Sequence, residues 1–214
     1  MPGPPADFSS RKVTPVEFDA VIFRTHNITR NPIFFGRSGL HRFDAPDRSY
    51  GVLYAGRDAH CAFVESFVKS GSRIITTTEL ESRALAELKP SKPLRLIDLT
   101  QSGTLMRIGA DARLFAGDHD VAQLWSMAFH EHPSRPDGLL YPSRLDQMRQ
   151  AIALFGDRSL KIVELSRQSW YAPGAQRHLL AEVIDHYDLQ LIENRFVAPR
   201  KPAASSSSRT GELF

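Results

Sequence analysis

Two segments of the sequence carry polar side chains whose types could serve one reaction. The first, His41–Glu65, reads HRFDAPDRSYGVLYAGRDAHCAFVE, and the second, Asp137–Arg144, reads DGLLYPSR. In chain order they supply a guanidinium at Arg42, a carboxylate at Glu65 and a hydroxyl at Ser143. A guanidinium binds planar anions through paired hydrogen bonds, and a carboxylate stabilises a positive charge that develops during a reaction. These three side chains are the first candidates for a functional site.

Glu65 has two interpretations. Lys69 lies four residues further along the expected helix, and a Glu–Lys pair at this spacing stabilises an exposed helix face. The helical wheel favours the second interpretation, because apolar side chains cover two arcs and leave a narrow polar gap for Glu65 and Lys69. Those apolar residues are Ala59, Phe63 and Phe67 on one arc and Cys61, Val64 and Val68 on the other. We therefore expect Glu65 to face a cleft.

Two arginines are candidates for binding a phosphate or a carboxamide. Arg42 precedes a Pro-containing turn, and Arg24 ends an expected strand, so both could converge on the mouth of one cleft. The alternative for each is a surface charge whose aliphatic stem covers apolar neighbours.

Tyr54 and Ser143 complete the candidate set. Tyr54 lies in an apolar strand, where its ring belongs to the core by default, but it could instead stack on a planar ligand. Tyr50 competes with it for that role. Ser143 follows Pro142 at a strand end, where serine usually forms a turn. Its functional alternative is a hydrogen bond that places Glu65 or the substrate, since no G-x-S-x-G elbow marks it as a nucleophile.

The sequence indicates no metal site. His130 and His132 are two residues apart, so they point to different faces of the expected helix, and the H-E-x-x-H spacing is absent. A histidine at a helix C-terminus is favoured by its charge alone. The single cysteine, Cys61, excludes an intrachain disulfide and a cysteine-based zinc site.

Short apolar runs and helical patterns interleave along the chain. The expected strands cover residues 20–24, 51–55, 94–99, 139–143 and 160–165, with another near 189. Asp58 can cap an expected helix that runs through Ser70, Thr78 one through Leu88 and Asp120 one through His130, and a further helix is expected over the segment after Gly174. The chain shows neither an internal repeat nor a regular βαβ order. This favours an α+β fold, a mixed sheet with flanking helices, over a doubly wound parallel sheet.

Composition indicates one globular domain, with 42% hydrophobic and 24% charged residues in a chain of 214. We expect a flexible N-terminal arm over residues 1–15, a catalytic domain over 16–198 and a disordered tail over 199–214, because both ends are rich in Pro, Ser and Ala. No apolar run approaches about 18 residues and no apolar signal core is present, so we expect a cytoplasmic protein without membrane contact. The net charge of +3 does not by itself indicate nucleic acid binding.

The pattern of both segments resembles the RES domain family, named for its arginine, glutamate and serine. The resemblance covers roughly Ala20 to Glu164. It rests on RF before a Pro-containing turn, then YGVLYA, an AF-x-E helix and DGLLY-x-S. Family sequences often carry glycine in the turn where this chain has Asp47-Arg48. We therefore expect a differently built turn, in which Arg48 could add charge beside the site.

The resemblance implies a fold similar to ADP-ribosyltransferase toxins and NAD as the substrate, with no further cofactor. In that role Glu65 would hold a ribose hydroxyl and favour the oxocarbenium-like state that forms as nicotinamide leaves, with Arg42 and Ser143 as the other catalytic residues. Arg24, Tyr54 and Arg42 would bind NAD. Members are often the toxin of a toxin–antitoxin pair, with a helix-turn-helix antitoxin as partner, so nucleic acid would be contacted only through that antitoxin.

The acceptor of the ADP-ribosyl group stays open. Water would make the protein a glycohydrolase, inorganic phosphate a phosphorylase, and a macromolecular side group an ADP-ribosyltransferase. Two other classes compete: a non-catalytic nucleotide-binding module, and a toxin that binds or cleaves RNA, for which a pI near 9.2 is weak support. The joint presence of Arg42, Glu65 and Ser143 disfavours the first. The lack of a basic stripe interleaved with aromatic residues disfavours the second.

Overall fold

The computed structural model describes residues 1–68, 72–158 and 160–193. Its strands are β1 (Val16–Phe18), β2 (Ile22–Asn27), β3 (Val52–Gly56), β4 (Ile74–Thr76), β5 (Arg83–Pro90), β6 (Leu94–Asp98), β7 (Gly138–Pro142), β8 (Gln150–Phe155), β9 (Ile162–Ser169) and β10 (Gln190–Ile192). Its helices are η1 (Phe8–Ser10), α1 (Ala59–Phe67), α2 (Thr77–Glu81), α3 (Thr104–Ile108), α4 (Arg113–Ala116), α5 (His119–Glu131) and α6 (Ala175–His186).

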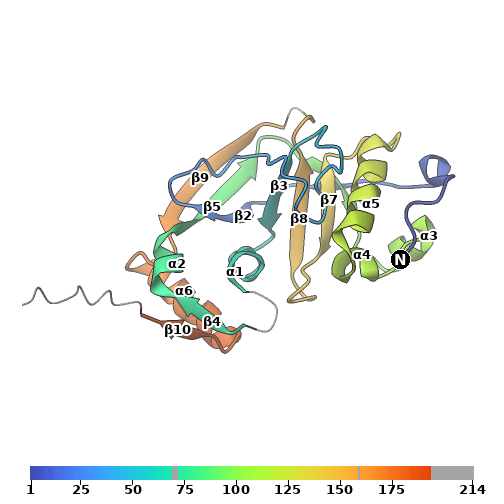
Figure 1. Ribbon diagram of the computed structural model, residues 1–214. Coiled ribbons are helices and arrows are strands. Elements are labelled where there is room, and N and C mark those ends of the chain that lie inside the picture. Colours follow the sequence, from blue (N-terminus) through green and yellow to red (C-terminus); the bar gives the residue numbers. More distant parts are fainter. Residues whose placement is uncertain (69–71, 159, 194–214) are drawn as a thin grey trace, which may run out of the picture.

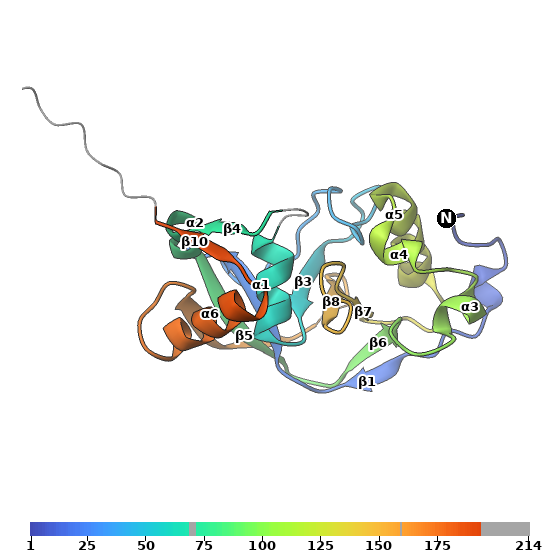
Figure 2. The same cartoon turned by 90° about the horizontal axis from the view of Figure 1, so that it is seen from below.

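Eight strands form one mixed sheet in the order β1-β6-β7-β8-β3-β2-β5-β9. Neighbouring strands are antiparallel except β6 and β7, which are parallel. The strands β4 and β10 form a separate parallel pair. Helices α1, α2 and α6 lie towards one end of the large sheet, and α3, α4 and α5 lie towards the other (Figures 1 and 2). The expected α+β fold, a mixed sheet with flanking helices, is therefore confirmed.

Alternate residues of the central strands face two different cores. On β8, Ala151, Ala153 and Phe155 join the core that also contains the apolar residues of α4 and α5. Ile152 and Leu154 join the core on the opposite face of the sheet. This is the two-residue period of a strand that is buried on both faces.

The two halves of the large sheet meet at β2 and β3, which share very little hydrogen-bonded pairing. Strands β2 and β3 pair only at Phe23 and Gly56, whereas β2 pairs along β5 and β3 pairs along β8. Helix α1 begins directly after β3, and a Cβ atom at Gly56 would lie 2.6 Å from the backbone nitrogen of Ala62. Glycine is therefore the residue that permits this close turn from strand to helix.

The main error of the secondary-structure prediction concerns β5. We expected a helix from Thr78 to Leu88, but α2 ends at Glu81 and residues 83–90 form a strand. Ala, Leu and Glu favour a helix in isolation, yet hydrogen bonding to β2 on one side and β9 on the other overrides that preference. Strands β1, β4 and β8 were not expected. The Asp58 cap of α1 is confirmed, because its Oδ1 accepts a hydrogen bond from the Cys61 amide at 2.8 Å.

The segment before β1 is packed against the domain. Phe8 is 4% exposed and Val13 is 7% exposed, and both belong to the core below α5. The ring of Phe8 meets the rings of Trp125 and Phe129 edge to face, at 5.3 Å from each. The expected flexible arm over residues 1–15 is therefore wrong for this segment, because Phe8 and Val13 are buried in the core of the domain. The expected tail over 199–214 lies outside the described residues.

The part of the chain that the structure describes contains no helix long and apolar enough to cross a membrane.

Candidate active site

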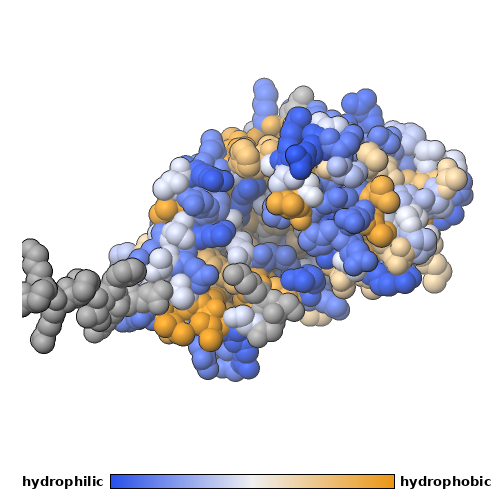
Figure 3. All heavy atoms as spheres, in the orientation of Figure 1, coloured by the Kyte–Doolittle hydropathy of each residue, from blue (hydrophilic) through white to orange (hydrophobic). Residues whose placement is uncertain are grey.

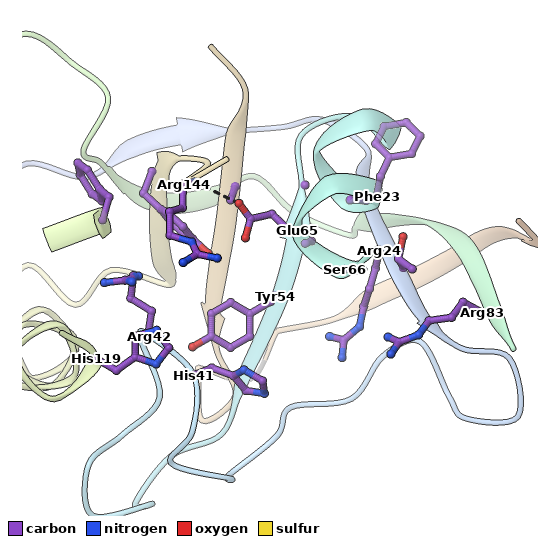
Figure 4. Close-up of a pocket in the computed structure, with 17 residues that line it drawn as sticks. Phe23, Arg24, His41, Arg42, Tyr54, Glu65, Ser66, Arg83, His119 and Arg144 are labelled. Carbon is purple, nitrogen blue, oxygen red and sulfur yellow. Dashed lines mark hydrogen bonds between the residues drawn. The ribbon is translucent and has the colours of Figure 1, made fainter. Parts of the chain in front are cut away.

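A cavity of about 600 Å³ opens where β2 and β3 separate. Its walls come from β2, β3, β5, β7, β8 and α1, with contributions from α4, the loop before β3, the segment after β7 and the start of α5 (Figure 4). In the space-filling view, this face of the molecule has a recess whose rim is partly hydrophilic and partly hydrophobic (Figure 3). The charged and histidine side chains that line the cavity are Arg24, His41, Arg42, Glu65, Arg83, His119 and Arg144.

Glu65 projects from α1 towards the centre of this cavity (Figure 4). Its Oε1 accepts a hydrogen bond from the Ser143 hydroxyl at 2.5 Å and another from the Arg144 amide at 3.2 Å. Its side chain is exposed, but to the cavity and not to an open helix face. The expectation that Glu65 faces a cleft is confirmed, while its alternative partner Lys69 lies outside the described residues.

Ser143 does not belong to the cavity wall. Its side chain is 1% exposed and lies behind Glu65, at the end of β7. Its Oγ also accepts hydrogen bonds from the amides of Leu145 and Asp146, both at 3.3 Å. The serine therefore fixes the orientation of the glutamate, which confirms the expected hydrogen bond from Ser143 to Glu65. Strand β7 ends at Pro142, and Arg144, which directly follows Ser143, lines the cavity.

Arg42 is held by backbone carbonyl groups. Its Nη1 donates to the carbonyl oxygen of Gly117 at 2.8 Å and to that of Leu114 at 3.3 Å. Burial, followed by the nearby charge of Arg144, lowers the pKa of the Arg42 guanidinium. Arg42 and Arg144 thus place two positive charges on the same side of the cavity (Figure 4).

A second pair of arginines lies on the other side of Glu65. Arg24 donates from Nη1 to the carbonyl oxygen of Phe34 at 3.2 Å, and burial lowers its pKa to about 10. Arg83 lines the cavity beside it (Figure 4). Sequence reasoning identified Arg24 but missed Arg83 and Arg144. Among the described residues, the lining thus has four guanidiniums and one carboxylate, a composition suited to an anionic ligand.

Tyr54 lines the cavity with its ring, while its hydroxyl is occupied. The hydroxyl donates to Asp44 Oδ1 at 3.0 Å and accepts from the Phe43 amide at 2.9 Å. Burial, with Tyr141 and Asp44 nearby, raises the pKa of this hydroxyl well above its usual value. The competing candidate, Tyr50, is 1% exposed and lies outside the cavity wall.

Two histidines of the cavity were not anticipated. His41 meets the Tyr54 ring edge to face at 5.5 Å, and His119 Nδ1 lies 3.0 Å from the carbonyl oxygen of Leu40. In the sequence, only the position of His41 next to Arg42 and that of His119 near the start of an expected helix could have indicated that they line the site. The histidines considered as metal ligands, His130 and His132, are not among the residues that line the cavity.

His130 Nε2 contacts both carboxylate oxygens of Asp157, and His132 Nδ1 contacts the Ser134 hydroxyl. No group of three His, Cys, Asp or Glu side chains within residues 1–68, 72–158 and 160–193 is arranged to hold a metal ion.

The Asp47-Arg48 turn is built without glycine but in a conformation that glycine favours. Arg48 has φ of +60°, in the left-handed region. Its side chain is not part of the cavity wall, so Arg48 is not one of the arginines that line the site. The turn instead directs the side chain towards Gly39, where a Cβ atom would lie 3.4 Å from Arg48 Nε.

Comparison with known proteins places the chain in a defined group. Residues 18–178 match the RES domain family. A protein named Probable toxin y4kH, from Sinorhizobium fredii (strain NBRC 101917 / NGR234), is 35% identical over 123 residues, which are 57% of this chain and 93% of that protein. The crystal structure of the M. tuberculosis MbcT–MbcA toxin–antitoxin complex contains a chain with the same fold. The TM-score is 0.60 at 16% identity, over 83% of this chain and 98% of that chain.

Proposed function

Because the chain belongs to the RES domain family, we propose that it consumes NAD by breaking the bond between nicotinamide and ribose. The observation that carries the proposal is the position of Glu65. Its carboxylate is anchored by Ser143 inside a cavity with four arginines. A dinucleotide has a diphosphate for the arginines and a ribose for the carboxylate, and cavities of 300–1,000 Å³ are typical for such ligands.

The chemistry follows from the charges. When the bond breaks, its electron pair leaves with nicotinamide, which becomes neutral, and the positive charge passes to the ribose carbon and ring oxygen. A carboxylate beside that carbon stabilises the oxocarbenium-like state more than the bound substrate. The arginines hold the diphosphate and thereby orient the ribose towards Glu65. An acceptor then forms the new bond to the ribose carbon.

We propose that this reaction needs no metal or other cofactor, since a fixed carboxylate is itself the cation-stabilising group. The test is incubation of purified protein with NAD, with and without inorganic phosphate, and chromatographic separation of the products. Nicotinamide with ADP-ribose would identify water as the acceptor, and ADP-ribose 1-phosphate would identify phosphate. ADP-ribose attached to a macromolecule would identify a transferase. Undiminished NAD would contradict the proposal, and activity that is lost in chelator and restored by zinc would contradict its metal-free part.

We further propose that the protein is the toxin of a toxin–antitoxin pair. Supporting this are the relative named as a probable toxin and the toxin–antitoxin complex that shares the fold. An antitoxin that inserts a segment into the cavity would block NAD, and a helix-turn-helix antitoxin would provide any contact with DNA. Co-expression with the gene adjacent to this one should yield a complex with reduced NAD turnover. An adjacent product that neither binds nor inhibits would contradict this assignment.

A further inference from the structure

A buried carboxylate next to the cavity has no place in the chemistry described so far. Asp44 is 1% exposed, and among the described residues no lysine, arginine or histidine forms an ion pair with it. Burying a carboxylate is costly unless hydrogen bonds replace the lost water. The donors that satisfy Asp44 therefore indicate what its burial achieves.

Those donors come from two separate parts of the site. Asp44 Oδ2 accepts from the Ser38 hydroxyl at 2.8 Å, from the Leu40 amide at 3.1 Å and from the His41 amide at 3.2 Å. Asp44 Oδ1 accepts from the Tyr54 hydroxyl at 3.0 Å. The two oxygens of one side chain thus connect the loop 38–43 to strand β3.

The connection closes through Tyr54. Its hydroxyl oxygen accepts the Phe43 amide at 2.9 Å, so the amides on both sides of Arg42 are fixed, one by Asp44 and one by Tyr54. The backbone at Arg42 therefore has little freedom relative to the ring of Tyr54. Both side chains face the cavity (Figure 4).

The same bonds restrict what Tyr54 can do. Its single proton is directed to Asp44, and a lone pair is directed to the Phe43 amide. Tyr54 is therefore arranged to present its ring face to a ligand and not to transfer a proton during the reaction.

We propose that Asp44 is a positioning residue of the active site, which sets Arg42 and Tyr54 in register with each other without touching the substrate itself. Only the kinetic test of this inference rests on the proposed function, because it measures the turnover of NAD. Hydrogen bonds to a charged group typically contribute enough that losing one changes an equilibrium about tenfold to a hundredfold.

The test compares Asp44→Asn with Asp47→Asn as a matched control. The asparagine keeps the size of the side chain but presents an NH2 group on one side, so one set of donors loses its acceptor. Asp47 accepts hydrogen bonds from Ser49 in an exposed turn outside the cavity wall. Asp44→Asn should raise KM for NAD about tenfold or more and lower kcat less, because the misplaced groups are those that bind. Asp47→Asn should retain the parent values.

A double-mutant cycle with Tyr54→Phe separates positioning from general stability. The two residues share one hydrogen bond, so the combined variant should lose little more than the worse single variant. The pH profile of kcat should keep its shape in Tyr54→Phe, since the hydroxyl transfers no proton. Additive losses, or a parental KM in Asp44→Asn, would overturn the inference. If the pH profile of kcat loses one limb in Tyr54→Phe, the hydroxyl does transfer a proton, and the role of Tyr54 as a ring surface alone is wrong.

Two further measurements keep the outcome decisive. If Asp44→Asn does not fold, Ser38→Ala removes one of the four donors and should still raise KM about tenfold. Amide hydrogen exchange at Leu40 and His41 should accelerate in Asp44→Ala, which removes both acceptor oxygens, and unchanged exchange would refute the inference. Exchange needs no turnover, so a wild-type protein that releases no nicotinamide would contradict the proposed function while the role of Asp44 is still decided.

Discussion

At the scale of single residues, the charge of Glu65 should matter more than its shape. Glu65→Gln preserves the acceptor that Ser143 needs but removes the negative charge. Nicotinamide release should fall about a hundredfold or more, while NAD affinity changes little, because the charge acts mainly on the transition state. Initial rates and a direct binding titration measure the two quantities separately.

The matched control is Glu182→Gln, on the exposed face of α6. It should leave both the rate and the affinity at parental values. If Glu65→Gln turns over NAD as fast as the wild type, another group stabilises the cation.

Arg42 should contribute to binding before any bond breaks. Arg42→Ala removes a guanidinium held over the cavity by Gly117, and NAD affinity should fall by roughly tenfold to a hundredfold. Arg42→Lys should recover part of the loss, since lysine keeps the charge but not the paired donors. Arg113→Ala, which breaks an exposed ion pair with Asp111, is the control and should bind NAD normally. Equal affinities in Arg42→Ala and the wild type would remove Arg42 from the ligand site.

The individual residues of the site were predictable to different degrees. Arg42 and Glu65 stand out because a motif surrounds them, and the helical wheel alone already turns Glu65 towards a cleft. Arg144 carried a signal only through its neighbour Ser143. Arg83 had none, because it fell in an expected helix and reaches the cavity only as part of β5, a strand that long-range pairing creates.

At the scale of elements, strands that depend on long-range pairing were likewise hard to predict from local sequence. The run at 151–155 is apolar on both faces, a pattern that periodicity cannot distinguish from a buried helix, and the run at 83–90 is rich in helix-forming residues. By contrast α1 was predicted with its cap, because Asp58 and the apolar arcs are local signals. Local sequence signals therefore determine the helix that carries Glu65, whereas strand pairing determines where Arg24 and Arg83 lie.

The turn from β3 into α1 should be intolerant of any side chain. Gly56→Ala would place its Cβ 2.6 Å from the Ala62 nitrogen, so α1 has to shift or the turn has to open. We expect a loss of about 1–3 kcal/mol in the free energy of unfolding, measured by urea denaturation, and reduced NAD turnover because Glu65 moves with α1. Gly36→Ala is the control, since its Cβ would meet Phe34 at an ordinary 3.5 Å. Equal stability of the two variants would show that the turn has spare room.

At the scale of the whole molecule, two hydrophobic cores that pack on the same sheet support the site. The core that includes α4 and α5 supports the loop with Arg42, and the core around α1 and α6 supports Glu65. The first of these cores is completed by the N-terminal segment. Its main anchor is Phe8, which lies against Trp125 and Phe129.

Removing that anchor should therefore weaken the fold far from the cavity. Phe8→Ala deletes a ring that is 4% exposed and leaves a void beside α5, which typically costs about 3–5 kcal/mol in the free energy of unfolding. Phe34→Ala removes the same number of atoms from a side chain that is 56% exposed, and it should cost less than about 1 kcal/mol. Thermal and urea unfolding of the two variants measure the difference. Because α5 also holds the loop before β3 through Gln123 and the carbonyl oxygens of Gly39 and His41, Phe8→Ala should reduce NAD affinity as well. If Phe8→Ala unfolds at the same temperature and the same urea concentration as the wild type, the Phe8 ring does not stabilise the domain.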